Sequence, residues 1–420
     1  MRDVQWVGRA LSNNEDPRMR GSSNIQPTMI QRYDESNLPD WTVFESSFNQ
    51  LDALLDADAD AQTIANFLET IPLFNFHLVS RGVDQSIPLF RARMPEKDFD
   101  LVSTYSLPPP DKCKQNRANR EGVPVFYAST FQPDTAIQEF LYAQGSSEAT
   151  PTVFVSEWRL LRPINVKQVL SSPETLRTDY LSPFYSDLWS RTNEMFQGYS
   201  SQGQETLKKL ASRLGDYFLR ETDHRVSSEI AHQALLPSDA EDELRIDAIA
   251  YPSRVKKHGA MNIALSATCA KENVALVRVL KVQVTHWDLY GSEVTIEAIG
   301  LPRGTQIRWF RPRLKPEAAK VVRTSISGTT AVKGKVKNIL IDGVDFQVGD
   351  LLKKLWTEKQ HEVLNNVLTR LLNFPDEETH VVHIPIIMKD RSIVVNGSPI
   401  EAIELKYSIE CNLSLVPEEV

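Results

Sequence analysis

The chain has 420 residues, of which 41% are hydrophobic and 24% are charged, and its formal net charge at pH 7 is −8. That length is enough for about two or three domains with separate cores, and the composition is ordinary for a globular protein. The negative charge argues against nucleic acid or an anionic membrane surface as the main partner.

The cysteines and the N-terminal segment bear on the cellular compartment. Cys113, Cys269 and Cys411 are far apart, form no CxxC pair and have no histidine at zinc-finger spacing, so we expect a reducing compartment and no metal site. The N-terminal segment lacks an apolar signal-peptide core, and no run of about 18 apolar residues is present to span a membrane. We therefore expect a cytoplasmic protein.

Residues 1–82 are predicted to form a polar arm followed by a small helical module. The first 40 residues are rich in Asn, Asp, Ser and Pro, which is typical of an irregular segment. Hydrophobic residues then recur at helical spacing from Phe44 to Leu55, and a second helix is predicted over about 61–70. We expect this module to pack on the domain that follows.

The next domain, predicted over 83–317, opens with the strand Leu89-Phe90-Arg91-Ala92-Arg93. Alternation puts Arg91 and Arg93 on the same face, so the pattern does not choose between them. The planar fork of an arginine can donate two parallel hydrogen bonds to a phosphate group. An isolated arginine at a strand edge is also a common surface residue.

Arg117, Tyr127 and Glu139 follow one another in a loop, a strand and a helix. The run VPVFYAS predicts a short strand that contains Tyr127, and the next segment predicts a helix capped by Asp134 with Glu139 near its start. The helix dipole favours a carboxylate there, so Glu139 fits a solvated capping role as well as a functional one. Tyr127 likewise fits an ordinary position at the edge of a core.

The segment from Val153 to Val169 predicts a strand and a connector, and a helical insertion is predicted over about 171–225. Its helices cover Pro183 to Arg220, and the stripe of leucines with Tyr217 predicts core packing rather than a cofactor site. Ala275–Trp287 alternates like a half-buried strand. The domain is therefore predicted to mix helices and strands.

Ser253 follows a strand-like run that starts at Ile246 and ends in Tyr251-Pro252. A serine directly after proline predicts a turn at a strand end, which is also its simplest explanation. No His and Asp arrangement or GxSxG motif accompanies Ser253, so we do not expect an activated nucleophile. A hydrogen bond to ribose or phosphate is the alternative role.

Residues 318–420 are predicted to form a separate α+β module. Asp342-Gly343 and Asn396-Gly397 predict two hairpin turns, and Asp350 predicts the cap of a helix that extends to about Leu372. The glycine-rich run at 328–336 lacks the spacing and the Ser or Thr of a phosphate loop. His380 and His383 have no further ligand set, so no metal site is expected there.

The segments LFRAR, NRANREGVPVFYAS, TAIQE and YPSR together resemble the RES domain, a family named for its Arg, Glu and Ser. The resemblance covers Leu89 to Leu265 in pieces and favours Arg91 over Arg93. Many family members have Gly-Gly-Arg-Trp-Asn where this chain reads Gln115-Asn116-Arg117-Ala118-Asn119, so we expect a different loop path there. The resemblance implies an ADP-ribosyltransferase-like mixed-sheet core within an α+β fold.

The resemblance also implies a role for each matching residue. Cleaving the nicotinamide–ribose bond of NAD develops positive charge on the sugar, and Glu139 would support that step. Arg91 and Arg117 would hold the substrate, Tyr127 would pack on nicotinamide, and Ser253 would complete the pocket. Asn262 matches a family position as well, and we expect it to support the pocket.

RES proteins act on NAD either as NAD-degrading toxins, including phosphorylases that use inorganic phosphate, or as ADP-ribosylating enzymes. The resemblance therefore implies an NAD phosphorylase or NAD glycohydrolase that uses NAD as substrate, with no prosthetic group and no metal. ADP-ribosylation of a macromolecule and an inactive binding module remain the alternatives. A neutralising antitoxin or regulatory partner is expected from the family, as in toxin–antitoxin pairs.

Overall fold

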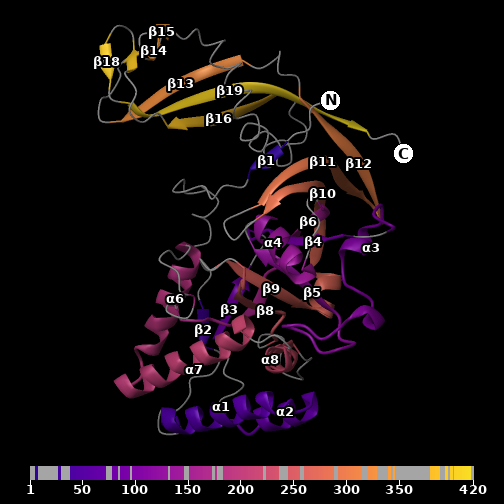
Figure 1. The fold of residues 1–420 in the computed structure, drawn as a ribbon, viewed down its shortest axis with the longest axis vertical. Coiled ribbons are helices and arrows are strands. Elements are labelled where there is room, and N and C mark those ends of the chain that lie inside the picture. Colours follow the sequence, from indigo (N-terminus) through magenta and orange to yellow (C-terminus); the bar gives the residue numbers. More distant parts are fainter. Residues whose placement is uncertain are drawn as a thin grey trace.

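A large mixed sheet with helices packed against it organises the chain in a computed structural model (Figure 1). The structure describes residues 5–7, 27–29, 38–71, 78–83, 86–94, 97–130, 133–145, 151–172, 176, 183–220, 224–235, 245–255, 260–287, 292–314, 320–328, 339–341, 344–345, 379–387, 393–395, 398–400 and 402–417. The presence of both helices and strands confirms the predicted α+β class.

The central part of the sheet contains the strands that carry the predicted site. In spatial order they are β12 (Gln306–Leu314), β11 (Ser292–Arg303), β10 (Val274–Trp287), β6 (Thr152–Leu160), β4 (Leu89–Arg93), β5 (Val125–Thr130), β9 (Met261–Ser266), β8 (Ala248–Pro252), β7 (Ile164–Gln168) and β3 (Leu78–Val83). Neighbours pair antiparallel along this path except β7 and β8, which are parallel. The strands predicted around Tyr127, before Ser253 and over 275–287 are thus confirmed.

Strands β8 and β9 are buried along almost their whole length, as expected for central strands covered on both faces. Two short N-terminal strands join the sheet: β2 (Pro27–Met29) pairs with β3, and β1 (Gln5–Val7) pairs with β11. These two strands fall in the segment predicted to be an irregular arm, so that prediction was wrong for them. The pairing partners lie far away in the sequence, which a local pattern does not reveal.

Helix α4 (Pro133–Gln144) packs against β4, β5 and β6, and it carries Glu139 in its second turn. The prediction that Asp134 caps this helix was wrong, because the helix already begins at Pro133. Proline suits a first helical position, since it lacks the amide hydrogen that would go unpaired there. The Asp134 carboxylate instead accepts hydrogen bonds from the amide and the hydroxyl of Ser292, which tie α4 to the start of β11.

The N-terminal helices and the helical insertion lie together at one end of the molecule (Figure 1). They are α1 (Trp41–Asp56), α2 (Ala61–Leu68), α6 (Pro183–Phe196), α7 (Ser201–Arg220) and α8 (Arg225–Leu235). Helix α8 begins where the predicted insertion ends and was not predicted. The α1 stripe of Phe44, Phe48 and Leu51 is buried, as predicted, and the side chain of Asp60 caps α2 by accepting from the amide of Thr63 at 2.7 Å.

Helix α7 joins the insertion to both neighbouring parts of the molecule. Leu207, Leu210, Leu214 and Tyr217 are buried, which confirms the predicted core stripe. The hydroxyl of Tyr217 donates to Asp52 of α1 at 2.9 Å, and Arg213 forms an ion pair with the same carboxylate. A Cβ atom at Gly215 would collide with the carbonyl oxygen of Leu170, so glycine allows α7 to approach the chain that leaves β7.

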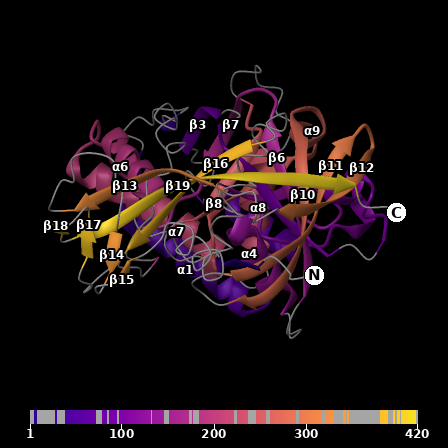
Figure 2. The ribbon, with the colours of Figure 1, turned by 90° about the horizontal axis from the view of Figure 1, so that it is seen from above.

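Strands β13 (Lys320–Gly328), β16 (Thr379–Ile387) and β19 (Ala402–Pro417) form the sheet in the C-terminal part. Figure 1 shows β13 and β16 on either side of β19, and Figure 2 shows the same strands from above. The two hairpins are confirmed: β14 (Ile339–Ile341) pairs with β15 (Val344–Asp345), and β17 (Ile393–Val395) pairs with β18 (Ser398–Ile400). Strand β19 also pairs with β12, which joins this part to the rest of the sheet.

Some C-terminal predictions concern residues that the structure does not describe. The helix predicted from Asp350 to Leu372, the two hairpin turns themselves and most of 328–336 lie outside the described residues. The domain boundary placed at 317/318 also falls outside them and stays a prediction. Within the described residues, no group of His, Cys, Asp and Glu is arranged to hold a metal, and no helix is long and apolar enough to cross a membrane.

Candidate active site around Glu139

The carboxylate of Glu139 is surrounded by hydrogen-bond donors from a different part of the chain. Its Oε1 atom accepts from the Ser253 hydroxyl at 2.5 Å, from Asn262 Nδ2 at 2.9 Å and from the Arg254 amide at 3.1 Å. The Glu139 side chain is only 18% exposed. This setting does not fit a solvated capping glutamate, because the carboxylate points into the protein and is held there.

Strand pairing brings the donors to Glu139. Strands β8 and β9 pair with Tyr251 opposite Asn262, and the Ser253 amide continues the ladder by donating to the Ala260 carbonyl at 2.7 Å. Strand β5 pairs with the other edge of β9 and places Ser129 opposite Asn262. The Ser129 hydroxyl donates to Asn262 Oδ1 at 2.7 Å, so the amide of Asn262 turns its NH₂ group toward Glu139.

Arg117 faces the other oxygen of the same carboxylate. Its Nη1 lies 3.6 Å from Glu139 Oε2, which is ion-pair distance but too long for a hydrogen bond. Both side chains are largely buried, so their attraction is screened less than that of a surface pair. Among the described residues, Oε2 accepts no hydrogen bond, and Glu139 therefore has one fixed oxygen and one oxygen with spare acceptor capacity.

Tyr127 holds the loop that carries Arg117. Its hydroxyl donates to Asn119 Oδ1 at 2.7 Å and accepts from the Ala118 amide at 2.8 Å. Burial raises the pKa of Tyr127 well above its ordinary value, although the charges of Arg117 and Arg91 act in the opposite direction. The hydroxyl thus stays protonated and able to donate. Sequence reasoning considered only the ring of Tyr127 and missed this anchoring role.

The two arginines of β4 are in different environments. Arg93 donates to the carbonyls of Thr104 and Ser106, at 2.5 Å and 2.8 Å, so its guanidinium is used within the fold. Arg91 lies over the ring of Phe126, 4.9 Å from the centroid, and its buried Nη1 has no hydrogen-bond partner among the residues that the structure describes. Burial lowers the pKa of Arg93 to about 10 and that of Arg91 well below its usual value.

The unsatisfied Arg91 donor distinguishes the two residues, because a buried cation without a partner is costly unless a ligand supplies the missing acceptor. The charges of Arg117 and Arg91 both act to lower the pKa of Tyr127. Glu139 accepts a hydrogen bond from Ser253 and lies within ion-pair range of Arg117. Tyr127 of β5 is hydrogen-bonded to Ala118, the residue after Arg117. Arg91 lies over the ring of Phe126, which precedes Tyr127 in β5.

Three supporting residues were missed by the sequence analysis. Ser129 orients Asn262, and Asn119 receives the Tyr127 hydroxyl, as described above. Tyr251 is 3% exposed and packs on Phe218 of α7, with ring centroids 5.1 Å apart. Burial raises the pKa of Tyr251, with Arg117 lowering it and Glu139 raising it. The position of Ser129 opposite Asn262 has no local sequence signal, since it depends on strand register.

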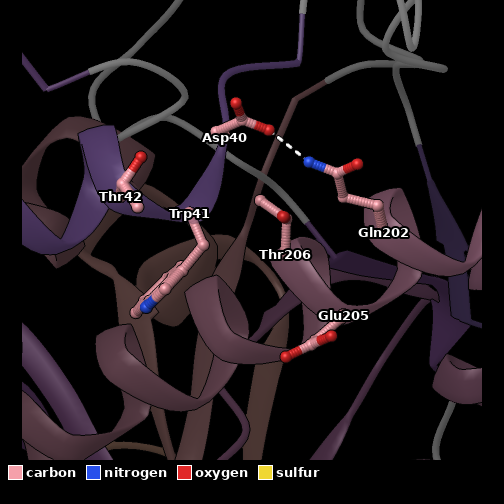
Figure 3. Close-up of a pocket in the computed structure, with 6 residues that line it drawn as sticks. All are labelled: Asp40, Trp41, Thr42, Gln202, Glu205 and Thr206. Atoms are coloured by element: carbon pink, nitrogen blue, oxygen red, sulfur yellow. Dashed lines mark hydrogen bonds between the residues drawn. The ribbon is translucent and has the colours of Figure 1, made fainter.

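A cavity of about 320 Å³ lies elsewhere, between the start of α1 and α7 (Figure 3). It is lined by Asp40, Trp41, Thr42, Gln202, Glu205 and Thr206, and Asp40 accepts a hydrogen bond from Gln202. None of these residues contacts the Glu139 carboxylate or its partners Arg117, Ser253 and Asn262 in the described part of the chain. Among the described residues, the lining has two carboxylates and no basic side chain, and Lys209 nearby is paired with Glu205, so the cavity is a poor match for a pyrophosphate.

A comparison with protein families supports the resemblance drawn from the motifs, whereas a comparison with curated proteins gave no match. Residues 88–290 match the sequence model of the RES domain family, a family associated with NAD-related toxins. The matched range includes the residues that match the motifs of the family, which are Arg91, Arg117, Tyr127, Glu139 and Ser253. The chain therefore contains a RES domain, which spans residues 88–290.

Proposed function

We propose that this RES domain cleaves the bond between nicotinamide and ribose in NAD. In that reaction the electron pair of the carbon–nitrogen bond leaves with nicotinamide, and an oxygen of phosphate or water forms the new bond at the anomeric carbon. The single observation that carries the proposal is that only one of the two carboxylate oxygens of Glu139 accepts hydrogen bonds from the described residues. Donors from Ser253, Asn262 and Arg254 fix Oε1, while Oε2 keeps its acceptor capacity.

A fixed carboxylate suits this chemistry because positive charge develops on the ribose in the transition state. An acceptor that is already oriented need not reorganise during the reaction, and removal of one such group typically costs about 100-fold to 1,000-fold in rate. Arg117 lies next to Oε2, and its guanidinium is free to turn to a phosphate oxygen when substrate enters. Ser253 acts here as a donor to Glu139 rather than as a nucleophile.

Arg91 supports binding of the substrate pyrophosphate. Within the described part of the chain its buried Nη1 has no hydrogen-bond partner, and a phosphate oxygen would satisfy it with a charge-assisted hydrogen bond. Phe126 holds the guanidinium by its ring face and leaves the edge of the fork for a ligand. Tyr127, through its ring, is the proposed contact for nicotinamide.

The experiment is incubation of the full chain with NAD, in the presence and in the absence of inorganic phosphate, with nicotinamide release as the readout. Release that depends on phosphate identifies phosphorolysis, and release without phosphate identifies hydrolysis. Label from NAD on a macromolecule would instead identify ADP-ribosylation. No release by the wild-type protein under any of these conditions would contradict the proposal. A neutralising partner protein is also proposed, from the family alone.

A further inference from the structure

The loop that carries Arg117 is held from a second side by helix α8. Arg120 donates from Nε to Glu229 Oε2 at 2.7 Å, and its Nη2 contacts the same oxygen. Gln115 Nε2 donates to the Ser228 hydroxyl at 3.3 Å. The loop therefore has two points of attachment on either side of Arg117, in addition to the Tyr127 hydroxyl that holds its middle.

Glu229 differs from the exposed acidic residues of the other helices. Its side chain is 6% exposed, whereas that of Arg120 is 41% exposed. Gln233 donates to the other carboxylate oxygen, Oε1, at 3.2 Å, so both oxygens are engaged. Removing either member of a buried ion pair leaves the remaining charge poorly compensated, which makes such a pair sensitive to substitution. The segment between Cys113 and Val123 has no helix or long strand to fix it otherwise.

Helix α8 is itself attached to the N-terminal helices. At its first residue, Arg225 donates from Nη2 to the Leu55 carbonyl at 3.2 Å and from Nη1 to the Ala59 carbonyl, and it lies 3.3 Å from the carboxylate of Asp58. Helix α8 also packs on α2 and on β8, the strand that leads to Ser253 (Figure 1). Continuous polar contacts thus run from the α1–α2 turn through α8 to the Arg117 loop.

We propose that Glu229 is a positioning residue, which holds the Arg117 loop against the Glu139 carboxylate through Arg120, with α8 braced by the N-terminal helices. The kinetic consequence rests on the proposed NAD cleavage, whereas the effect on the loop does not. A small displacement of Arg117 would matter because its Nη1 is already 3.6 Å from Oε2. Misplacement of a group at a reacting centre by about 1 Å can cost roughly 100-fold in rate.

The test compares the full-length variants Glu229→Gln and Arg120→Gln, their double variant, and the matched control Glu205→Gln. Glu205 pairs with Lys209 on the exposed face of α7, so its substitution makes the same chemical change away from the loop. Two readouts are used: hydrogen–deuterium exchange of residues 113–122 without NAD, and kcat and KM for nicotinamide release.

We expect faster exchange in 113–122 for both single variants, no further increase in the double variant, and a loss of roughly tenfold to 100-fold in kcat/KM. Exchange in 113–122 that matches the Glu205→Gln control would overturn the proposal. So would strictly additive effects in the double variant, since these would mean that Glu229 and Arg120 act independently. Because exchange is measured without NAD, it decides the positioning role even if the wild type releases no nicotinamide, a result that would count against the proposed function alone.

Discussion

The Tyr127 hydroxyl gives a prediction that separates two roles of one side chain. Tyr127→Phe keeps the aromatic ring and removes only the hydroxyl, which donates to Asn119 Oδ1 and accepts from the Ala118 amide. If Tyr127 served only to pack its ring on nicotinamide, the substitution would be nearly silent. If the hydroxyl holds the Arg117 loop, stability and activity both fall.

The expected magnitude follows from the two lost hydrogen bonds. Ala118 is 1% exposed and Asn119 is 4% exposed, so water does not readily replace the missing partner. At about 1 kcal/mol for each bond, we expect the free energy of unfolding to fall by about 2 kcal/mol. If the loss of about 2 kcal/mol affects only the loop that carries Arg117, the ratio of molecules with this loop in place to molecules with it detached falls roughly 30-fold.

Urea unfolding measures the stability of Tyr127→Phe, and nicotinamide release at low NAD concentration measures its activity. Tyr127→Leu serves as the comparison, because it removes the ring as well and should lose additional activity if the ring contacts nicotinamide. Wild-type stability together with wild-type turnover in Tyr127→Phe would refute the anchoring role. It would leave the ring as the only functional part of this residue.

The remaining predictions concern three other positions and one matched control. Arg91→Lys should raise KM for NAD about tenfold, because lysine lacks the planar fork of arginine. Arg93→Lys should mainly lower the melting temperature, because Arg93 bonds within the fold. Equal KM values for the two variants would contradict the choice of Arg91 as the substrate-binding residue. Ser253→Ala should lower the free energy of unfolding by about 1–2 kcal/mol and reduce turnover at least roughly tenfold, and full turnover would remove Ser253 from the site. Burial lowers the pKa of Lys167 to about 7. Between pH 7 and the ordinary lysine pKa, the unfolded chain therefore binds more protons at this position than the folded chain. The free energy of unfolding then rises with pH, by up to roughly 1.4 kcal/mol per pH unit. Lys167→Met should weaken that rise, which urea unfolding from neutral to alkaline pH measures; an unchanged slope would show that Lys167 does not cause it.

The local elements of the site were predictable because each depends on a short stretch of sequence. The strand through Tyr127 and the helix through Glu139 follow from hydrophobic spacing, and the end of a strand just before Ser253 follows from the proline at that point. The resemblance then named the residues that should meet. Spacing alone gave no reason why Glu139 should touch Ser253, since the two lie on separate elements.

The contacts that depend on strand register and packing were not predictable in this way. The choice between Arg91 and Arg93 required the carbonyls of Thr104, in α3 (Val102–Tyr105), and Ser106, which accept from Arg93 in the folded chain. Ser129 depends on its register with Asn262. Pairing of β12 with β19 similarly joins two segments that are far apart in the chain.

The two C-terminal hairpins were predictable because their pairing depends only on a short turn between neighbouring strands. A two-residue loop with Asp-Gly or Asn-Gly determines both the turn and the pairing of the strands beside it. Strands β14 with β15 and β17 with β18 pair as that rule requires. The arrangement of these hairpins in one small sheet, where β14 also pairs with β17, again required the structure.

Nicotinamide release by wild type, Glu139→Gln and the exposed control Glu205→Gln tests the central claim most directly. Glutamine keeps the shape of Glu139 but removes the negative charge that faces Arg117 and the proposed ribose position. We predict that wild type and Glu205→Gln release nicotinamide from NAD at similar rates and that Glu139→Gln is slower by at least about 100-fold. Equal rates in Glu139→Gln and wild type, or no release by the wild-type protein, would contradict the account.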